Sequence, residues 1–127
     1  MKKDFNSWNT LKQGIELHTK KVYANQREIW WSSIGINIGS ESCGKNNLFE
    51  RPVLILKVIS KDLLLVAPLS TKNKNNKYHI EIDVTKGKSY LLLEHIKTMS
   101  TKRLTRKIDR VSKDVFKNVC SQYKNLL

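Results

Sequence analysis

Two apolar runs near the middle of the chain are the feature that most limits its fold. They cover residues 52–59 and 63–68, and a short polar turn at residues 60–62 separates them. Each run has the length of a strand and is far too short to cross a bilayer, which takes about 20 apolar residues. A short, nearly continuous apolar run bounded by turn residues is typical of a strand buried on both faces. The sequence therefore predicts a central pair of strands.

Further strand-like segments lie on both sides of this pair. Residues 28–34 and 90–93 have strand-like composition, and apolar side chains alternate with polar ones in residues 78–84. A period of two is typical of a strand with one buried face, so His79 is expected to point outward. Residues 94–112 mix strand-like and helix-like pieces and predict no single element.

A helical pattern opens the chain. In residues 4–21, apolar side chains recur at spacings near three and four, at Phe5, Trp8, Leu11 and Ile15. Gly14 weakens such a helix by roughly 1 kcal/mol relative to alanine, so the helix should depend on packing. We expect Phe5, Trp8 and Leu11 to be buried against the rest of the protein or against a second subunit.

A second helical pattern closes the chain. Ser112 fits an N-cap, and the residues after it place one apolar stripe inward: Val115, Phe116, Val119, Cys120 and Tyr123. The chain is thus predicted to be mainly β with terminal helices, folded as a small, strongly bent β-barrel. Residues 1–26 form a helical extension in this interpretation, and residues 27–127 form the barrel with its C-terminal helix.

The charge balance indicates a polyanionic partner. The chain has 127 residues, enough for one domain, and its 24 Lys and Arg against 11 Asp and Glu give a net charge of +13. Nucleic acid is the first candidate and an acidic protein segment the second. The basic start lacks a following apolar region, so we expect a cytoplasmic protein with no membrane association. Cys43 and Cys120 have no spacing typical of a metal site, and a disulfide is not expected.

The Gly- and Asn-rich segment before the central strands contains GSESCGKN at residues 39–46. This differs by one residue from the phosphate-binding loop G-x-x-x-x-G-K-[ST], because Asn46 replaces the hydroxyl residue. Such a loop works when it opens a helix, whereas here Pro52 and a strand follow. Glu41 would also place a negative charge beside the phosphates. A nucleotide site is therefore not expected.

Several separated blocks resemble the MazF/PemK family of toxin endoribonucleases. In chain order they read EIWW, GSESCG, RPVLIL, VAPLST, HIEID and LLLEHIKTMSTKRLTRKI, over residues 27–116. The resemblance implies an SH3-like barrel of the MazF/PemK/CcdB type that forms a homodimer. It also implies cleavage of single-stranded RNA without metal or cofactor, and inhibition by an antitoxin with an acidic, poorly ordered tail.

The resemblance implies catalytic roles for three residues of the central strands. Arg51 matches the functional arginine at the start of the family's second strand, where a guanidinium can hold two phosphate oxygens. Its alternative role is a surface ion pair with Glu50 or Glu41. Ser70 aligns with the catalytic threonine, and its neighbour Thr71 carries a second hydroxyl. Both could instead be simple strand-end turn residues.

Two further candidates are less directly matched. Glu41 corresponds to the glutamate of the GSE motif and could orient substrate or take a proton, or have no such part. His95 stands where relatives often carry glutamine, and it could donate a hydrogen bond, titrate, or be a barrel-edge residue without a catalytic role.

Basic side chains on the loops are candidate contacts to the RNA backbone. The set comprises Lys45, Lys72, Lys74, Lys77, Lys102 and Arg103. Trp30 or Trp31 could stack on a base, although at least one should be in the core because neighbouring strand residues face opposite ways. The favoured function is a sequence-selective endoribonuclease toxin that leaves 2′,3′-cyclic phosphate and 5′-hydroxyl ends. The alternative is an SH3-like module that binds RNA or DNA without cutting it.

Overall fold

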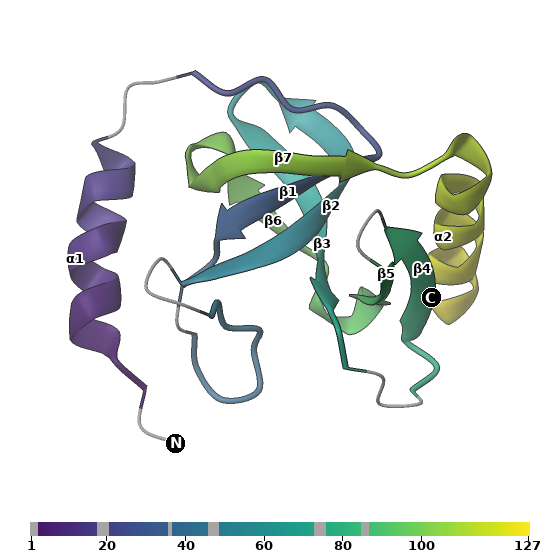
Figure 1. Ribbon diagram of the computed structural model, residues 1–127, viewed down its shortest axis with the longest axis horizontal. Helices are drawn as coiled ribbons and strands as arrows, with labels where there is room; N and C mark the ends of the chain where they lie inside the picture. The colour runs from purple at the N-terminus through teal and green to yellow at the C-terminus, as the bar shows by residue number, and fades with distance from the viewer. Residues whose placement is uncertain (1–2, 18–20, 36, 46–48, 73–75, 85–86) are drawn as a thin grey trace.

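The computed structural model describes residues 3–17, 21–35, 37–45, 49–72, 76–84 and 87–127. Seven strands form an antiparallel sheet between two helices, one near each end of the chain (Figure 1). The helices are α1 (Phe5–Glu16) and α2 (Lys113–Leu126), and short 3-10 turns occupy η1 (Leu93–His95) and η2 (Thr101–Arg103). The strands are β1 (Glu28–Ser33), β2 (Glu50–Ser60), β3 (Leu63–Ser70), β4 (His79–Val84), β5 (Gly87–Leu92), β6 (Lys97–Ser100) and β7 (Leu104–Arg110).

The hairpin of β2 and β3 is the centre of the sheet. β2 pairs with β1, which pairs with β7, while the other edge of β3 is shared by two strands. The first half of β3 pairs with β6, and its last two residues pair with β5. The strand order is β4-β5-β3-β2-β1-β7, so among the described strands the hydrogen-bonded path ends at β4 and β7 and the sheet is not closed. The predicted class, mainly β with terminal helices, is confirmed.

The hairpin is buried on both faces, as its composition predicts. One cluster gathers alternate residues of β2 and β3 with residues of β6 and β7 and the residue that follows β1: Ile34, Val53, Ile55, Leu64, Val66, Met99 and Leu104. The other lies on the opposite side: Ile29, Leu54, Ala67, Leu69, Ile80, Ile82, Leu91, Leu93, Val111 and Val119. Because two cores share one hairpin, its backbone is fixed from both sides.

The alternation in β4 is confirmed, with one exception. Ile80 and Ile82 are buried, and Glu81 and Asp83 are exposed. The exception is His79, which lies on the same face of the strand as Glu81 and Asp83, as predicted, but has a side chain that is only 4% exposed. Its ring contacts Glu94, which follows β5 in the 3-10 turn η1.

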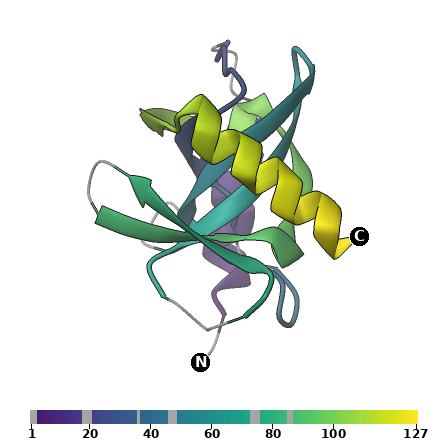
Figure 2. The ribbon, with the colours of Figure 1, turned by 90° about the vertical axis from the view of Figure 1, so that its right-hand side faces the viewer.

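Helix α2 lies across the sheet in Figure 2 and covers the second core cluster with Val115, Phe116 and Val119. The predicted N-cap is confirmed, since the Ser112 hydroxyl accepts a hydrogen bond from the Val115 amide at 3.2 Å. Cys120 was expected to face inward and is exposed. It lies one position beyond the buried Val119, so the turn of the helix places it at the edge of the apolar stripe.

Helix α1 is anchored by Trp8. The Asp4 side chain caps it by accepting from the Ser7 amide at 3.0 Å, and the helix ends at Glu16, earlier than predicted. Trp8 is 6% exposed, its ring centroid lies 5.7 Å from that of Phe49, and it occupies the space above Gly35. A Cβ at Gly35 would lie 2.0 Å from the indole, so only glycine at this position leaves room for the Trp8 ring.

The other two side chains expected to be buried are less enclosed. Phe5 is 48% exposed and Leu11 is half-buried, so the contact made by α1 depends mainly on Trp8. In the part of the chain that the structure describes, no helix is long and apolar enough to cross a membrane.

Replacing Trp8 with alanine should lower the thermal stability of the whole protein. Truncating a buried tryptophan costs about 3–5 kcal/mol, which corresponds to a drop in Tm of roughly 10–20 °C for a domain of this size. Leu17→Ala is the matched control, because Leu17 is 79% exposed at the end of the same helix. Calorimetry that gives the same Tm for Trp8→Ala and for the unaltered protein would contradict this role of Trp8.

Candidate active site

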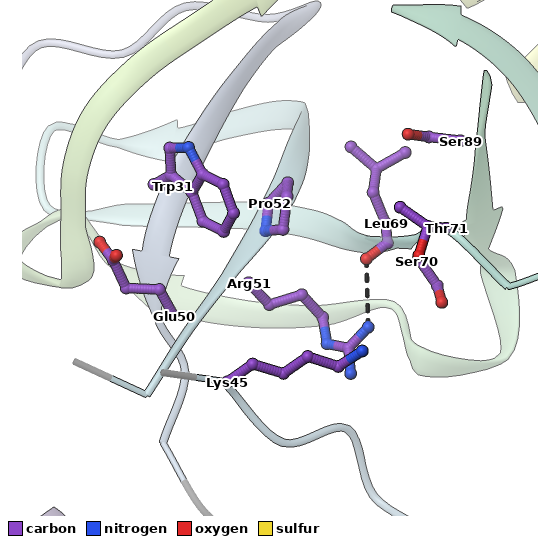
Figure 3. A pocket seen from close by; sticks show the side chains of 9 residues that line it. All are labelled: Trp31, Lys45, Glu50, Arg51, Pro52, Leu69, Ser70, Thr71 and Ser89. Atoms are coloured by element: carbon purple, nitrogen blue, oxygen red, sulfur yellow. Dashed lines mark hydrogen bonds between the residues drawn. The ribbon is translucent and has the colours of Figure 1, made fainter. Parts of the chain in front are cut away.

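The candidate site lies where the start of β2 meets the end of β3. Two adjoining cavities of about 200 Å³ and 260 Å³ open there, and Lys45, Arg51 and Ser70 line both. Figure 3 shows the smaller cavity, with the side chains of Lys45 and Arg51 running alongside each other toward Leu69 and Ser70. Residues far apart in the sequence, from the segment before β2 and from the end of β3, are thus brought together.

Arg51 is held by main-chain carbonyl groups. Its Nε donates to the Cys43 carbonyl at 3.0 Å, and one terminal nitrogen donates to the Leu69 carbonyl at 3.2 Å. Burial lowers the pKa of Arg51, and the nearby Cys43 sulfur acts in the opposite direction. A guanidinium has more N–H donors than these two bonds use in the described part of the chain. The two hydrogen bonds therefore fix the direction of the Arg51 side chain, and the remaining N–H groups of its guanidinium are left for a ligand in the cavities that it lines.

Glu50, a predicted alternative partner of Arg51, interacts with β7 instead. Its carboxylate is 1% exposed, accepts from the Thr105 hydroxyl, and lies 3.2 Å from an Arg106 nitrogen. Glu41 accepts a hydrogen bond from the amide of Ile38 at 2.9 Å. These contacts order the segments on either side of Arg51, which itself donates to the main-chain carbonyl groups of Cys43 and Leu69.

Main-chain hydrogen bonds place Lys45 beside Arg51. The amide and carbonyl of Lys45 exchange hydrogen bonds with those of Glu50, at 2.7 and 2.8 Å. Gly44 donates to the Gly35 carbonyl, and a Cβ at Gly44 would lie 1.7 Å from the carbonyl oxygen of Phe49. The GSESCG motif thus ends in a glycine because two backbone segments touch there. Among the described residues, the next element is the strand β2, whereas a phosphate-binding loop opens a helix.

The cavities hold a concentration of positive charge. Burial lowers the pKa of Lys45, and the positive charges of Arg51 and Lys72 lower it further. Three cations that repel one another at this distance are stabilised when an anion enters among them. The site is therefore suited to bind a phosphate group.

Two hydroxyl groups lie at the exit of β3. Ser70 lines both cavities, and its hydroxyl accepts from the Lys72 amide at 3.2 Å. Thr71 lines only the smaller cavity and is exposed. The geometry places the Ser70 hydroxyl between the two spaces that adjoin Arg51.

The larger cavity also contains the remaining catalytic candidates. Glu41 and His95 line it, together with Lys72. It further contains a pair that the sequence pattern did not reveal, in which His79 Nε2 lies 2.7 Å from Glu94 Oε2. The only sequence signal was a polar residue on the outer face of a strand, which by itself does not indicate a partner fifteen positions away.

The other basic candidates lie outside the two cavities or outside the described residues. Lys102 Nζ donates to the Glu16 carbonyl of α1 at 3.0 Å, and Arg103 lies 5.7 Å from the Trp8 ring. Lys77 lies over the ring of Tyr78, and Lys74 falls outside the described residues. Lys45 and Lys72 are the members of this set that line the larger cavity with Arg51.

The two tryptophans of β1 have different surroundings. Trp30 packs against the first core cluster and donates to Glu28 at 3.1 Å, whereas Trp31 lines the smaller cavity. The guanidinium of Arg106 lies 4.9 Å from the Trp31 ring centroid. Within the described ranges, no three His, Cys, Asp or Glu side chains are grouped to hold a metal ion, and Cys43 and Cys120 are free thiols.

Sequence comparison identifies the family. The model of the PemK-like, MazF-like toxins of type II toxin-antitoxin systems matches residues 25–127. This chain belongs to that family. The matched region contains every strand of the sheet and the helix α2, and α1 precedes it. The comparison with curated protein sequences gives no match.

Solved structures of MazF proteins have the same fold. MazF (Form-I) from Deinococcus radiodurans aligns with a TM-score of 0.66 at 18% identity, covering 81% of this chain and 94% of its own. The Mycobacterium tuberculosis toxin MazF-mt6 aligns with a TM-score of 0.61 at 18% identity, covering 78% and 94%. A MazE-MazF (Form-II) structure from D. radiodurans gives 0.61 at 17%, covering 83% and 96%. At these identities the likeness concerns the fold.

Replacing Gly44 with alanine in this MazF-like toxin should destabilise it, because the added methyl group would collide with the backbone at Phe49. Overpacking of this kind costs about 1–3 kcal/mol. Gly14→Ala is the control of opposite sign, since Gly14 is helical with open space around it and alanine there gains about 1 kcal/mol. Denaturant unfolding that ranks Gly44→Ala as stable as Gly14→Ala would refute this assignment.

Proposed function

We propose that this MazF-like toxin is an endoribonuclease that cuts single-stranded RNA, such as mRNA, without a metal ion. The 2′-hydroxyl of one nucleotide attacks the adjacent phosphate, leaving a 2′,3′-cyclic phosphate and a free 5′-hydroxyl. The observation that carries the proposal is the convergence of Arg51, Ser70, Lys45 and Lys72 on one cavity. This set contains a bidentate phosphate ligand, a hydroxyl donor and two further cations.

Arg51 is the principal group in this mechanism. Negative charge grows on the phosphoryl oxygens during attack, and a guanidinium that already points at them stabilises that charge without rearranging. The hydrogen bonds to the two carbonyl groups hold the guanidinium in place before the substrate binds. Ser70, or its neighbour Thr71, donates a hydrogen bond to the same phosphate. Glu41 and His95 line the same space and are candidates to orient the substrate.

Binding along the RNA uses phosphate contacts and stacking. Lys45 and Lys72 flank the scissile position, and the more distant Lys74, Lys77, Lys102 and Arg103 are candidates to follow the backbone. The Trp31 ring in the smaller cavity offers a surface on which a base can stack. Selectivity for a cut sequence would come from unstacked bases read by the loops around these cavities.

The same surface should receive the inhibitor. We propose that a cognate antitoxin with an acidic, poorly ordered segment covers the basic site, and that the toxin acts in the cytoplasm as a homodimer. The family membership and the MazE-MazF structure from D. radiodurans support an antitoxin partner. We further propose that residues 1–26 form an extension added to the barrel of residues 27–127.

Cleavage by the purified toxin, free of antitoxin, should persist in EDTA and stop when the nucleotide at the cut carries a 2′-deoxyribose. Arg51→Ala should lower the single-turnover rate on the order of 10²-fold or more, because it removes a contact that strengthens in the transition state. Arg110→Ala, an exposed arginine at the end of β7, is the matched control and should keep the rate.

The non-catalytic alternative predicts a different result in the same assay. A binding module would hold single-stranded RNA tightly and leave it intact for hours. Cutting that requires added magnesium would indicate another nuclease chemistry. Ser70→Ala should lose less activity than Arg51→Ala if Thr71 substitutes, and the double variant of both hydroxyls should then lose more.

Association with an acidic peptide rich in Asp and Glu should slow as salt rises, because exposed charges are screened over about 10 Å at 0.1 M. The peptide should also inhibit cleavage, and its Asn and Gln analogue should not. Lys45→Gln with Lys72→Gln should lower the association rate, whereas Lys88→Gln, on the exposed pair with Glu81, should not. Stopped-flow rates that are independent of salt would refute electrostatic capture.

A further inference from the structure

His79, in the larger cavity, has the one buried side-chain nitrogen or oxygen without a hydrogen-bond partner in the described part of the chain. Its side chain is 4% exposed, Nε2 lies 2.7 Å from Glu94 Oε2, and the buried Nδ1 has no hydrogen-bond partner there. A buried polar atom without a partner typically costs about 1–3 kcal/mol, so such an atom beside a cavity calls for an explanation. The substrate itself is one source of the missing hydrogen bond.

Strand register places His79 on the same face as Ser70. Ser70 pairs with Tyr90, and His79 pairs with Leu92, two residues further along β5. Residues two apart on a strand share a face, so Ser70 and His79 project from the same side of β3, β5 and β4. Both side chains line the larger cavity together with Arg51.

The contact with Glu94 determines which ring nitrogen carries the proton. A carboxylate only accepts hydrogen bonds, so the neutral imidazole donates from Nε2 and keeps a lone pair on Nδ1. This is the arrangement in which a carboxylate orients a histidine that acts as a base through its other nitrogen.

We propose that His79 is the catalytic base of the toxin and that Glu94 is its positioning residue. The inference rests on the proposed RNA cleavage. Nδ1 takes the proton of the 2′-hydroxyl as the 2′-oxygen forms its bond to phosphorus and the bond from phosphorus to the 5′-oxygen breaks. The leaving 5′-oxygen takes a proton from solvent, and the imidazolium later returns one to solvent. Nothing else is consumed.

Charged groups around the cavity determine how this step depends on pH. Lys45, Arg51, Lys72, Glu41, Glu94 and His95 line the same cavity as His79 and are the charged or titratable groups that face it. Only the neutral ring can accept the proton. The cleavage rate should therefore fall as pH decreases, because a protonated imidazole has no lone pair with which to accept the proton.

The test is the single-turnover rate of His79→Gln against pH, on the full chain. Glutamine places an N–H donor near the former Nε2, so it keeps the contact with Glu94 and removes only the base. The rate should fall by about 10²–10⁴-fold, with RNA affinity changed less than about threefold and the acidic limb of the profile lost. Glu81→Gln, two residues along β4 and exposed, is the matched control and should keep the profile.

Each other outcome has a definite meaning. His79→Gln that cuts at the wild-type rate, or keeps the acidic limb, overturns the assignment. So does loss of that limb in His95→Gln but not in His79→Gln. A wild-type toxin that never cuts RNA refutes the proposed function instead.

Nitrogen NMR of the wild-type imidazole tests the tautomer without any cleavage and without a variant that must fold. At a pH where His79 is neutral, its Nε2 should carry the proton and its Nδ1 the lone pair. A proton found on Nδ1 of the neutral ring would overturn the proposal.

Discussion

The burial of one hairpin on both faces is the constraint on which the rest of the structure depends. β2 and β3 send alternate side chains into two separate clusters, so each face needs its own covering. The first cluster is completed by residues of β6 and β7, and the second by β4, β5 and α2. Because β3 uses its free edge for both β6 and β5, the sheet divides at β3, and the small β3-β5-β4 part forms one wall of the site.

The site is located where this buried hairpin becomes polar. Arg51 follows the first residue of β2, and Ser70 is the last residue of β3, so the rigid core ends on both strands at the same place. Carbonyl groups of Cys43 and Leu69 hold the guanidinium, which joins the preceding loop to the end of β3. Positive charges held together in this way repel one another, so an anion that entered among them would be stabilised.

The N-terminal helix interacts with a different part of the surface. The Trp8 ring packs against Gly35 and Phe49. The basic residues Lys102 and Arg103 contact the same helix. Burial lowers the pKa of Arg103, whose guanidinium also donates to the Ser33 carbonyl. Part of the positive charge of the chain therefore stabilises the attachment of α1, and the charge near Arg51 is a separate group.

Sequence determined the elements and the central candidates, because these depend on local patterns. Apolar runs identified β2 and β3, alternation identified β4, capping identified α2, and the separated motifs selected Arg51 and Ser70. Residues 94–112 had no single period, since short turns and two strands follow one another there. The tertiary structure alone decided that Cys120 is exposed, that Lys102 and Arg103 lie against α1, and that His79 is enclosed with Glu94. Those outcomes depend on contacts between segments far apart in the chain. The local spacing of apolar residues does not show which distant side chain will cover a given residue.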